Sequence, residues 1–291
     1  MKLFLNNILS STSSIFKVII LSKFFGVLKT KKATKNSCII LGNGPSLTKS
    51  LVKYQDQLKE YDLVCVNNFV ISDIYTCLKP TYYILAAPIL YLHEAKLSSL
   101  YLELRNQIFS NIQEKTSWNL TLMVPFVAKK SNYFNLFLTN NPLIKPIYFN
   151  QTPVEGFSSI NKLIFNLGLG MPRPHNIMIP AIMNCINLNY KYIYLIGADH
   201  SWLPDINVNE KNEALVNQKH FYDENESRPE KMQDYISRPR KLHEIIHKFY
   251  LTFKGYWIIK EYAANKNVSV YNASEISMID AFERKEIPEI N

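Results

Sequence analysis

Short apolar runs alternate with longer stretches of helical apolar spacing along the chain from residue 37 onward. Seven short runs predict β-strands, at residues 38–41, 63–66, 82–85, 120–124, 147–149, 192–196 and 268–271. Five longer stretches predict helices, at residues 48–59, 91–113, 157–167, 180–188 and 241–265. Strands that alternate with helices are typical of βαβ units. The pattern therefore predicts an α/β fold, a single Rossmann-like domain over residues 36–291, with a mainly parallel, doubly wound sheet and helices on both faces.

The positions of the prolines add two details to this prediction. Pro180 has no backbone N–H and fits the first turn of a helix, so we expect a helix to begin beside it. Residues 203–240 are polar and contain Pro204, Pro229 and Pro239. Such a segment predicts a long, lid-like loop, which is a common location for functional residues.

Residues 1–35 form a basic, apolar N-terminal extension. Its two apolar clusters, residues 3–9 and 15–28, are separated by residues 10–14 and broken by Lys17 and Lys23. No uninterrupted apolar run reaches the roughly 18–20 residues that a spanning helix needs. Residues 15–28 are instead compatible with a basic helix on an anionic membrane surface. The alternative is a helix docked on the protein's own core, followed by a lysine-rich linker over residues 28–36.

The net charge of +9 belongs to this end of the chain. Nine of the 33 basic residues precede the first acidic residue, Asp56, and the other 24 match the 24 acidic residues. A nucleic-acid-binding body would spread its basic residues over a folded face, so no nucleic-acid partner is expected. The apolar fraction of 47% fits an ordered globular protein.

The four cysteines lie in apolar contexts and form no CxxC pair. They predict buried free thiols in a reducing compartment, without a structural zinc site. We therefore expect a cytoplasmic protein, peripheral on the inner face of the cytoplasmic membrane if residues 1–32 contact it. The four are Cys38, Cys65, Cys77 and Cys185.

Polar residues follow four of the predicted strands. Ligands bind beyond the carboxyl ends of the strands in open α/β sheets, so these residues should gather where a ligand lies. Packing of a hydrophobic core alone does not require polar residues at the ends of four strands. The segments are Gly42-Asn43-Gly44, Asn67-Asn68, Gly197-Ala198-Asp199-His200 and Asn272-Ala273-Ser274.

The first of these turns continues as Pro45-Ser46-Leu47 into a predicted helix. Glycines allow positive φ and close backbone approach, and a helix N-terminus presents N–H groups suited to phosphate. The turn is neither a Walker A loop nor a GxGxxG fingerprint. The alternative is an ordinary strand-to-helix turn in which Ser46 caps the helix.

The other strand ends also have two interpretations. Asn67 and Asn68 can bind ribose hydroxyls or a base edge, or can simply form a turn. Asp199 beside His200 can orient a ligand or a catalytic group, or Asp199 can close the strand in an Asx turn.

Three histidines, His220, His243 and His247, are candidates for a general base because imidazole titrates near neutrality. The run from His243 to His247 matches HExxH, but no further histidine follows as a third ligand, so no metal site is expected. Four cations near the polar loop can close over phosphates or form a solvated surface; they are Arg228, Arg238, Arg240 and Lys241.

Three segments occur in the same order as in two related protein groups: residues 39–47, residues 66–69 and residues 188–199. The chain resembles the small bacterial sialyltransferases of glycosyltransferase family 42. It also resembles the 6-hydroxymethylpterin diphosphokinase-like family, which is similar to the central domain of motility accessory factors. The resemblance covers residues 37–275, with specific motifs at these three points only.

Resemblance to the sialyltransferases implies a metal-independent, inverting transfer from a CMP-activated sugar to a bacterial surface glycan. The donor-binding positions it indicates, together with those from the strand ends, are Gly42, Asn43, Gly44, Pro45, Ser46, Asn67, Asn68, Gly197, Tyr222 and Asn272. A histidine before the last helix acts as the base in that family, and His247 or His243 stand nearest. The family holds the leaving phosphate with tyrosines where this chain has His200-Ser201-Trp202, so His200 or Tyr222 takes that role, or none does. The asparagine that the family has after the third strand is replaced near residues 86–87.

Resemblance to the diphosphokinase-like group implies ATP and magnesium at the same turn, with Asp199 as a metal contact. A third possibility is a non-catalytic nucleotide-binding protein of glycan assembly. The basic, apolar extension favours glycosyl transfer, with a nucleotide-sugar donor, a glycan or glycolipid acceptor and no cofactor. A homo-oligomer is left open.

Overall fold

The structure, a computed structural model, describes residues 1–25, 33, 35–222, 228–233 and 238–289. Its centre is an eight-stranded sheet in the order β11-β10-β6-β1-β2-β3-β4-β5, in which every neighbouring pair is parallel. The strands are β1 (Ser37–Leu41), β2 (Asp62–Val66), β3 (Tyr82–Ile84), β4 (Leu120–Pro125), β5 (Ile144–Phe149), β6 (Tyr192–Ile196), β10 (Ser269–Asn272) and β11 (Glu283–Arg284).

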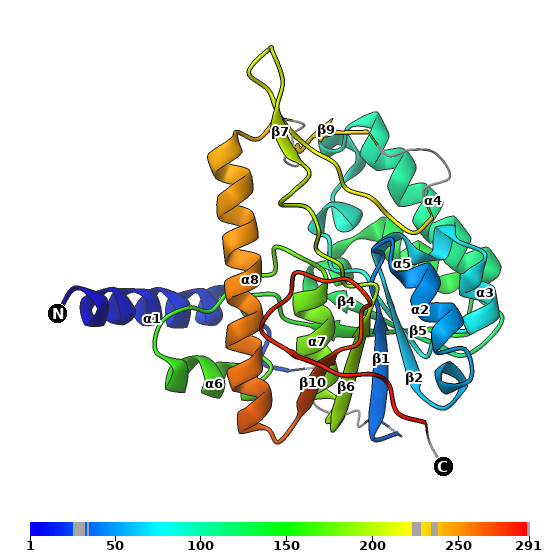
Figure 1. The fold of residues 1–291 in the computed structure, drawn as a ribbon, viewed down its shortest axis with the longest axis horizontal. Helices are drawn as coiled ribbons and strands as arrows, with labels where there is room; N and C mark the ends of the chain where they lie inside the picture. Colours follow the sequence, from blue (N-terminus) through cyan, green and yellow to red (C-terminus); the bar gives the residue numbers. More distant parts are fainter. Residues whose placement is uncertain (26–32, 34, 223–227, 234–237, 290–291) are drawn as a thin grey trace.

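Helices cover both faces of this sheet, and β1 shows why (Figure 1). Its buried side chains alternate, so that Cys38 and Ile40 belong to one apolar cluster while Ile39 and Leu41 belong to the other. The first cluster contains α6 (Ser158–Asn166), α7 (Met178–Asn187) and α8 (Leu242–Asn265). The second contains α2 (Leu47–Lys53), α3 (Ile74–Leu78), α4 (Ser99–Lys115) and α5 (Asn132–Thr139). The predicted doubly wound, Rossmann-like α/β fold is confirmed.

All seven predicted strands are present, and most of their ends agree to within one residue. β5 begins three residues early, at Ile144, and β11 was not predicted. Pro180 lies in the first turn of α7, as expected.

Two predicted helices were too long. The helix expected over residues 48–59 ends at Lys53, and a separate 3₁₀ turn follows at Gln57–Lys59. The helix expected from residue 91 begins only at Ser99, after the 3₁₀ turns Pro88–Tyr91 and Glu94–Lys96. Extended backbone at Leu97 and Ser98 interrupts the second one.

The segment predicted as a lid-like loop contains a small sheet. Strands β7 (Ile206–Val208), β8 (Ala214–Val216) and β9 (Glu230–Lys231) pair antiparallel near the N-terminal end of α8 (Figure 1). Strands of two or three residues are too short to show a period-2 pattern in the sequence. Residues 223–227 and 234–237 of this segment lie outside the described residues.

The N-terminal extension forms one continuous helix, α1 (Lys2–Leu21), rather than a helix over residues 15–28. Its serine cluster lies inside the helix. Ser14 Oγ donates to Glu155 O and accepts from Glu155 N–H, and Ser11 Oγ accepts from Phe157 N–H. A Cβ on Gly156 would come within 2.1 Å of Ser11 Oγ, so glycine permits this close contact. Most of the expected linker over residues 28–36 lies outside the described residues.

The turns that follow β1 and β6 touch through their backbones. Gly44 N–H donates to Gly197 O at 2.8 Å, and a Cβ on Gly42 would lie 2.4 Å from the same oxygen. Gly197 has φ +63°, and a Cβ there would lie 2.7 Å from Gly42 O and 2.8 Å from Leu47 Cβ. Gly42 and Gly44 are therefore needed for close approach, whereas positive φ occurs only at Gly197 among these three.

Replacement of Gly197 by alanine should destabilise the protein by about 2–4 kcal/mol, because it combines a left-handed backbone with two contacts too short for a methyl group. Urea unfolding followed by circular dichroism measures this change. Gly255→Ala on α8 is the control, since its Cβ would meet only the end of the Ile179 side chain, at 2.9 Å. A Gly197→Ala loss no larger than that of Gly255→Ala contradicts the prediction.

Candidate functional site

The expected ligand edge of the sheet contains a cavity. It lies beyond the carboxyl ends of β1, β2 and β6, where the chain order reverses between β1 and β6. This reversal is the switch point at which open α/β sheets bind ligands. The cavity has a volume of about 100 Å³ and is lined by residues 42–45, 66–67, 176–178, 197–202 and 219–220.

Backbone amides of the first turn do not point freely into this cavity. Gly42 N–H donates to Ile196 O, Gly44 N–H to Gly197 O, and Leu47 N–H to Gly44 O. Ser46 N–H donates to Asp199 Oδ2 at 2.8 Å, and Pro45 has no N–H. These four positions therefore offer no backbone N–H to a phosphate, and the predicted phosphate site depends on the remaining N–H groups of this turn and of the first turn of α2.

Asp199 is a structural partner of Ser46. One carboxylate oxygen accepts the Ser46 N–H, and the other accepts a short hydrogen bond from the Ser46 hydroxyl. Burial raises the pKa of Asp199, and the two bonds from Ser46 oppose that rise. The carboxylate thus takes the place at the start of α2 that a ligand anion would need. Each carboxylate oxygen of Asp199 therefore holds one hydrogen bond to Ser46, which fixes the orientation of the group at the cavity wall.

Asn43 offers the clearest polar group for a ligand. Its Nδ2 donates to Val66 O at 3.2 Å, whereas its Oδ1 is buried without a hydrogen-bond partner. A buried, unpaired acceptor is costly, so it marks a place where a ligand N–H or O–H can bind. Asn67, half-buried with φ +49°, lines the same cavity. Asn68 is also half-buried and is not among the lining residues.

Part of the predicted lid segment covers the first turn. Phe221 N–H donates to Asn43 O at 3.0 Å, and its ring lies 5.3 Å from that of Phe69. His220 lines the small cavity and also a second, larger cavity of about 1220 Å³. The larger cavity is lined by residues of the small sheet, of α4 and of α8. His220 therefore forms part of the wall of both cavities.

Tyr222 lines the larger cavity and not the small one. Its ring stacks on that of His220 at a centroid distance of 5.1 Å. The structure thus brings Tyr222 close to the site through His220.

His200 is held as a neutral side chain. Its Nε2 is 2.5 Å from the Tyr256 hydroxyl, and its ring packs against Trp202 at 4.3 Å. Burial lowers the pKa of His200 to about 3. A catalytic base works best with a pKa near the operating pH, so His200 in this arrangement is better suited to positioning than to proton abstraction.

The two histidines expected to supply the base lie elsewhere. His243 and His247 are exposed on α8 and line neither cavity. Glu244, between them, pairs with Arg238 at 3.0 Å and accepts the Lys241 N–H, so it caps the helix. Within the described part of the chain, no group of three His, Cys, Asp or Glu residues is placed to hold a metal ion.

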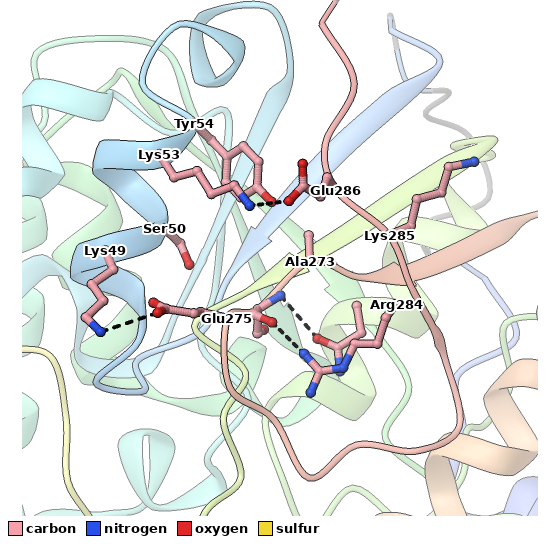
Figure 2. Close-up of a pocket in the computed structure, with 11 residues that line it drawn as sticks. Lys49, Ser50, Lys53, Tyr54, Ala273, Glu275, Arg284, Lys285 and Glu286 are labelled. Atoms are coloured by element: carbon pink, nitrogen blue, oxygen red, sulfur yellow. Dashed lines mark hydrogen bonds and ion pairs between the residues drawn. The ribbon is translucent and has the colours of Figure 1, made fainter.

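Asn272 belongs to a different cavity. Its Nδ2 donates to Ser277 Oγ and Ile279 O, and its Oδ1 accepts from Ser274 N–H, so the amide shapes its own loop. Figure 2 shows this third cavity, of about 540 Å³, where α2 faces the C-terminal segment. Lys49 pairs there with Glu275 (Figure 2). Asn272, which was expected to bind the donor, therefore lines a different cavity from Asn43.

The sequence reasoning missed two residues that organise the site. Tyr256 holds His200 and also donates to Asn176 Oδ1 at 3.4 Å. Asn176 itself lines the small cavity. Tyr256 lies inside a long apolar helix pattern, which gives no sign of a polar contact. The cysteines also differ from the expectation in one case, because Cys77 is exposed while the other three are buried.

Comparison with known proteins agrees on the fold. No protein-family model and no curated protein matches the sequence. A similar solved structure is described as "Structure of MAf glycosyltransferase from Magnetospirillum magneticum AMB-1", with a TM-score of 0.51 and 11% identity. The two chains share a fold. The match covers 97% of this chain and 38% of the other, so this chain spans less than half of that protein's length. The likeness supports a glycosyltransferase-like fold and does not itself identify a sialyltransferase.

His200 should make the protein sensitive to acid. Its folded pKa of about 3 lies below its ordinary value of 6.5, so between these values the unfolded chain binds a proton that the folded chain excludes. Stability is lost as the pH falls through this window, by about 2–3 kcal/mol at pH 4.5 relative to pH 7. Urea unfolding at both pH values, compared for the wild type and His200→Asn, measures this term.

Asparagine tolerates the left-handed backbone at position 200, where φ is +52°. His93→Asn is the control, since His93 is exposed on the surface. The loss between the two pH values should shrink in His200→Asn and persist in His93→Asn. Equal losses in all three proteins contradict the prediction.

Proposed function

We propose that this protein is a glycosyltransferase that moves a sugar from a nucleotide-activated donor to a bacterial surface glycan. One observation carries the proposal: the buried, unpaired Oδ1 of Asn43 at the switch point of the sheet. The glycosyltransferase-like fold supports the reaction class. The finer proposal, transfer of sialic acid or a related sugar from a CMP donor, rests on the resemblance of residues 39–47, 66–69 and 188–199.

The donor nucleoside fits the small cavity. Asn43 Oδ1 is an acceptor suited to a ribose hydroxyl or a base amino group, and the Asn67 side chain lines the wall beside it. A volume of about 100 Å³ is below that of typical ligand sites. A complete donor therefore extends toward the larger cavity, whose wall also includes His220.

The acceptor glycan fits the larger cavity, and His220 is placed between it and the donor. We assign His220 the role of general base, which removes the proton from the acceptor hydroxyl as that oxygen attacks the sugar carbon and the nucleotide leaves. His220 precedes the last helix, as the base histidine of the sialyltransferases does. His243 and His247 are the alternatives, and both are farther along the chain, on α8 itself.

The diphosphokinase-like alternative is less well supported by the site. It needs a metal contact at Asp199, whose two oxygens both bind Ser46. Glycosyl transfer without a metal ion needs no such contact, so the proposed reaction has no cofactor.

We further propose that α1 holds the protein at an anionic membrane. The helix docks on the body through its buried serines, which leaves large apolar side chains outward; Phe16 is 66% and Ile20 is 65% exposed. By length and composition Phe4–Leu21 is able to cross a membrane. A spanning helix would have to give up the bonds of Ser11 and Ser14 to the body, so we favour a helix lying in the membrane surface.

The charge near α1 supports a lipid partner over a second copy of the chain. Lys2 and Lys23 are exposed, Lys17 is half-buried, and no acidic residue precedes Asp56. Anionic headgroups complement this charge, whereas a second copy of α1 would repel it. Residues 26–32 of the expected contact segment lie outside the described residues.

Asn43→Ala should remove donor binding, because it deletes the acceptor that the cavity presents. Calorimetry with CMP- and UDP-sugars, with and without EDTA, measures the dissociation constant, and a loss of about tenfold or more is expected for a hydrogen bond to a buried group. His220→Asn should keep donor binding and lower turnover by about 10²-fold or more. His243→Ala and His247→Ala should leave turnover unchanged.

Two results would overturn the proposal. One is the absence of binding to every nucleotide sugar, together with ATP-dependent pyrophosphorylation of a pterin. The other is donor uptake by Asn43→Ala equal to that of the wild type. Full activity of His220→Asn would reject only the assignment of the base.

A variant with Phe16, Ile19 and Ile20 replaced by aspartate should lose vesicle binding. Each large apolar side chain is worth roughly 1.5–3 kcal/mol when buried, so three together exceed a tenfold effect. Cosedimentation with vesicles of phosphatidylglycerol and phosphatidylcholine measures it.

The matched control replaces three exposed apolar residues of the body, Val52, Leu136 and Ile276, by aspartate. Equal binding by the α1 variant and the wild type would refute membrane docking. Membrane docking would also be refuted if the wild type does not bind vesicles and forms a dimer that the α1 variant does not form.

A further inference from the structure

Two cations and one histidine that is neutral near pH 7 lie together beside the site, on the loop before α7 and at the start of α8. They are His175, Arg240 and Lys248, and each interacts electrostatically with at least one other. His175 directly precedes Asn176, which lines the small cavity, and Lys248 lines the larger one. The cluster therefore reaches the wall of the larger cavity at Lys248, and its histidine adjoins a residue of the small cavity.

Acidic residues nearby are already engaged. Glu155 pairs with Arg173 at 3.2 Å, and Glu244 pairs with Arg238 at 3.0 Å. Among the residues that the structure describes, Lys248 Nζ forms no ion pair or hydrogen bond. Arg240 Nε is buried and has no hydrogen-bond partner.

This arrangement is unfavourable for the empty protein. Burial lowers the pKa of Lys248, and the neighbouring Arg240 lowers it further. Burial also lowers the pKa of His175 to about 4, and Lys248, Arg173 and Arg240 contribute to the shift. Partly buried cations without a counter-charge cost stability, and an anion that binds among them removes that cost.

Four backbone N–H groups of the first turn are not offered to a phosphate. The N–H groups of Gly42, Gly44, Ser46 and Leu47 are bonded within the protein, and Asp199 puts a negative charge at the start of α2. Side-chain cations outside the turn are then suitable partners for the phosphate of a nucleotide whose nucleoside contacts Asn43. Phe249, the residue after Lys248 on α8, stacks at 5.0 Å on Trp202, which lines the small cavity.

We propose that Arg240 and Lys248, with His175, form the binding site for the phosphate of the nucleotide donor. This inference rests on the proposed function. In it the chain divides donor recognition between two places: the amides of Asn43 and Asn67 bind the nucleoside, and side-chain cations on α8 and its approach bind the phosphate. Arginine and lysine are the side chains best suited to phosphate oxygens.

Binding and thermal unfolding of Lys248→Met and Arg240→Gln test the site, with EDTA present throughout. CMP and UDP should bind each variant about tenfold or more weakly than the wild type, whereas cytidine and uridine should bind equally well. Inorganic pyrophosphate should raise the unfolding midpoint of the wild type and not that of the variants. Without any anion, Lys248→Met should unfold at the same temperature as the wild type or higher, because it removes an unpaired, partly buried charge.

Lys260→Met is the matched control, since Lys260 is an exposed lysine on the same helix and its loss changes the net charge equally. It should respond to pyrophosphate as the wild type does. The inference is overturned if nucleotides bind Lys248→Met and Arg240→Gln as tightly as the wild type, or if Lys260→Met loses as much affinity as they do. A different result would separate the two proposals. If pyrophosphate raises the unfolding midpoint of the wild type but not of the two site variants, and the wild type binds no nucleotide or nucleoside, the anion site stands and the proposed function is wrong.

Discussion

The contact between the turns after β1 and β6 determines what this site can do. Two glycines, Gly42 and Gly197, bring the turns so close that the carbonyl of each would collide with a Cβ on the other. Ser46 and Asp199 then join the start of α2 to the end of β6. Every backbone amide used in this contact is lost to a ligand. Residues 42–47, whose sequence predicts a phosphate-binding turn, therefore join the ends of β1 and β6 in the structure.

Side chains take over where the backbone is occupied. The amide nitrogen of Asn43 binds Val66 O, and its oxygen is buried without a hydrogen-bond partner in a residue that lines the cavity. Among the described residues, Arg240 and Lys248 form no ion pair with an acidic residue, and Glu155 and Glu244 are engaged by other arginines. Neutral amides and unpaired cations bind different parts of a nucleotide, so their separation argues for a ligand that is polar at one end and anionic at the other.

The sequence predicts the sheet well because its signal is local. The strand at residues 192–196 is flanked by turn residues and was placed correctly at both ends. The four polar strand ends were also found, and three of them do meet at one cavity. Pairings between distant residues could not be predicted: nothing in the sequence shows that Asp199 binds Ser46, that Tyr256 holds His200, or that Asn272 bonds within its own loop. The apolar spacing of residues 3–28 also left open whether this segment docks on the core or lies on a membrane, and it did not show that Ser11 and Ser14 of α1 face the body.

The described structure shows the site in a covered state. Phe221 binds Asn43 through its backbone and packs on Phe69, so the segment that contains His220 lies over the place proposed for the nucleoside. The small cavity has a volume of only about 100 Å³, so a complete donor that contacts Asn43 also occupies part of the larger cavity, whose wall includes His220. Because His220 directly precedes Phe221, the backbone bond that fixes Phe221 over Asn43 also fixes the proposed base beside the proposed position of the nucleoside.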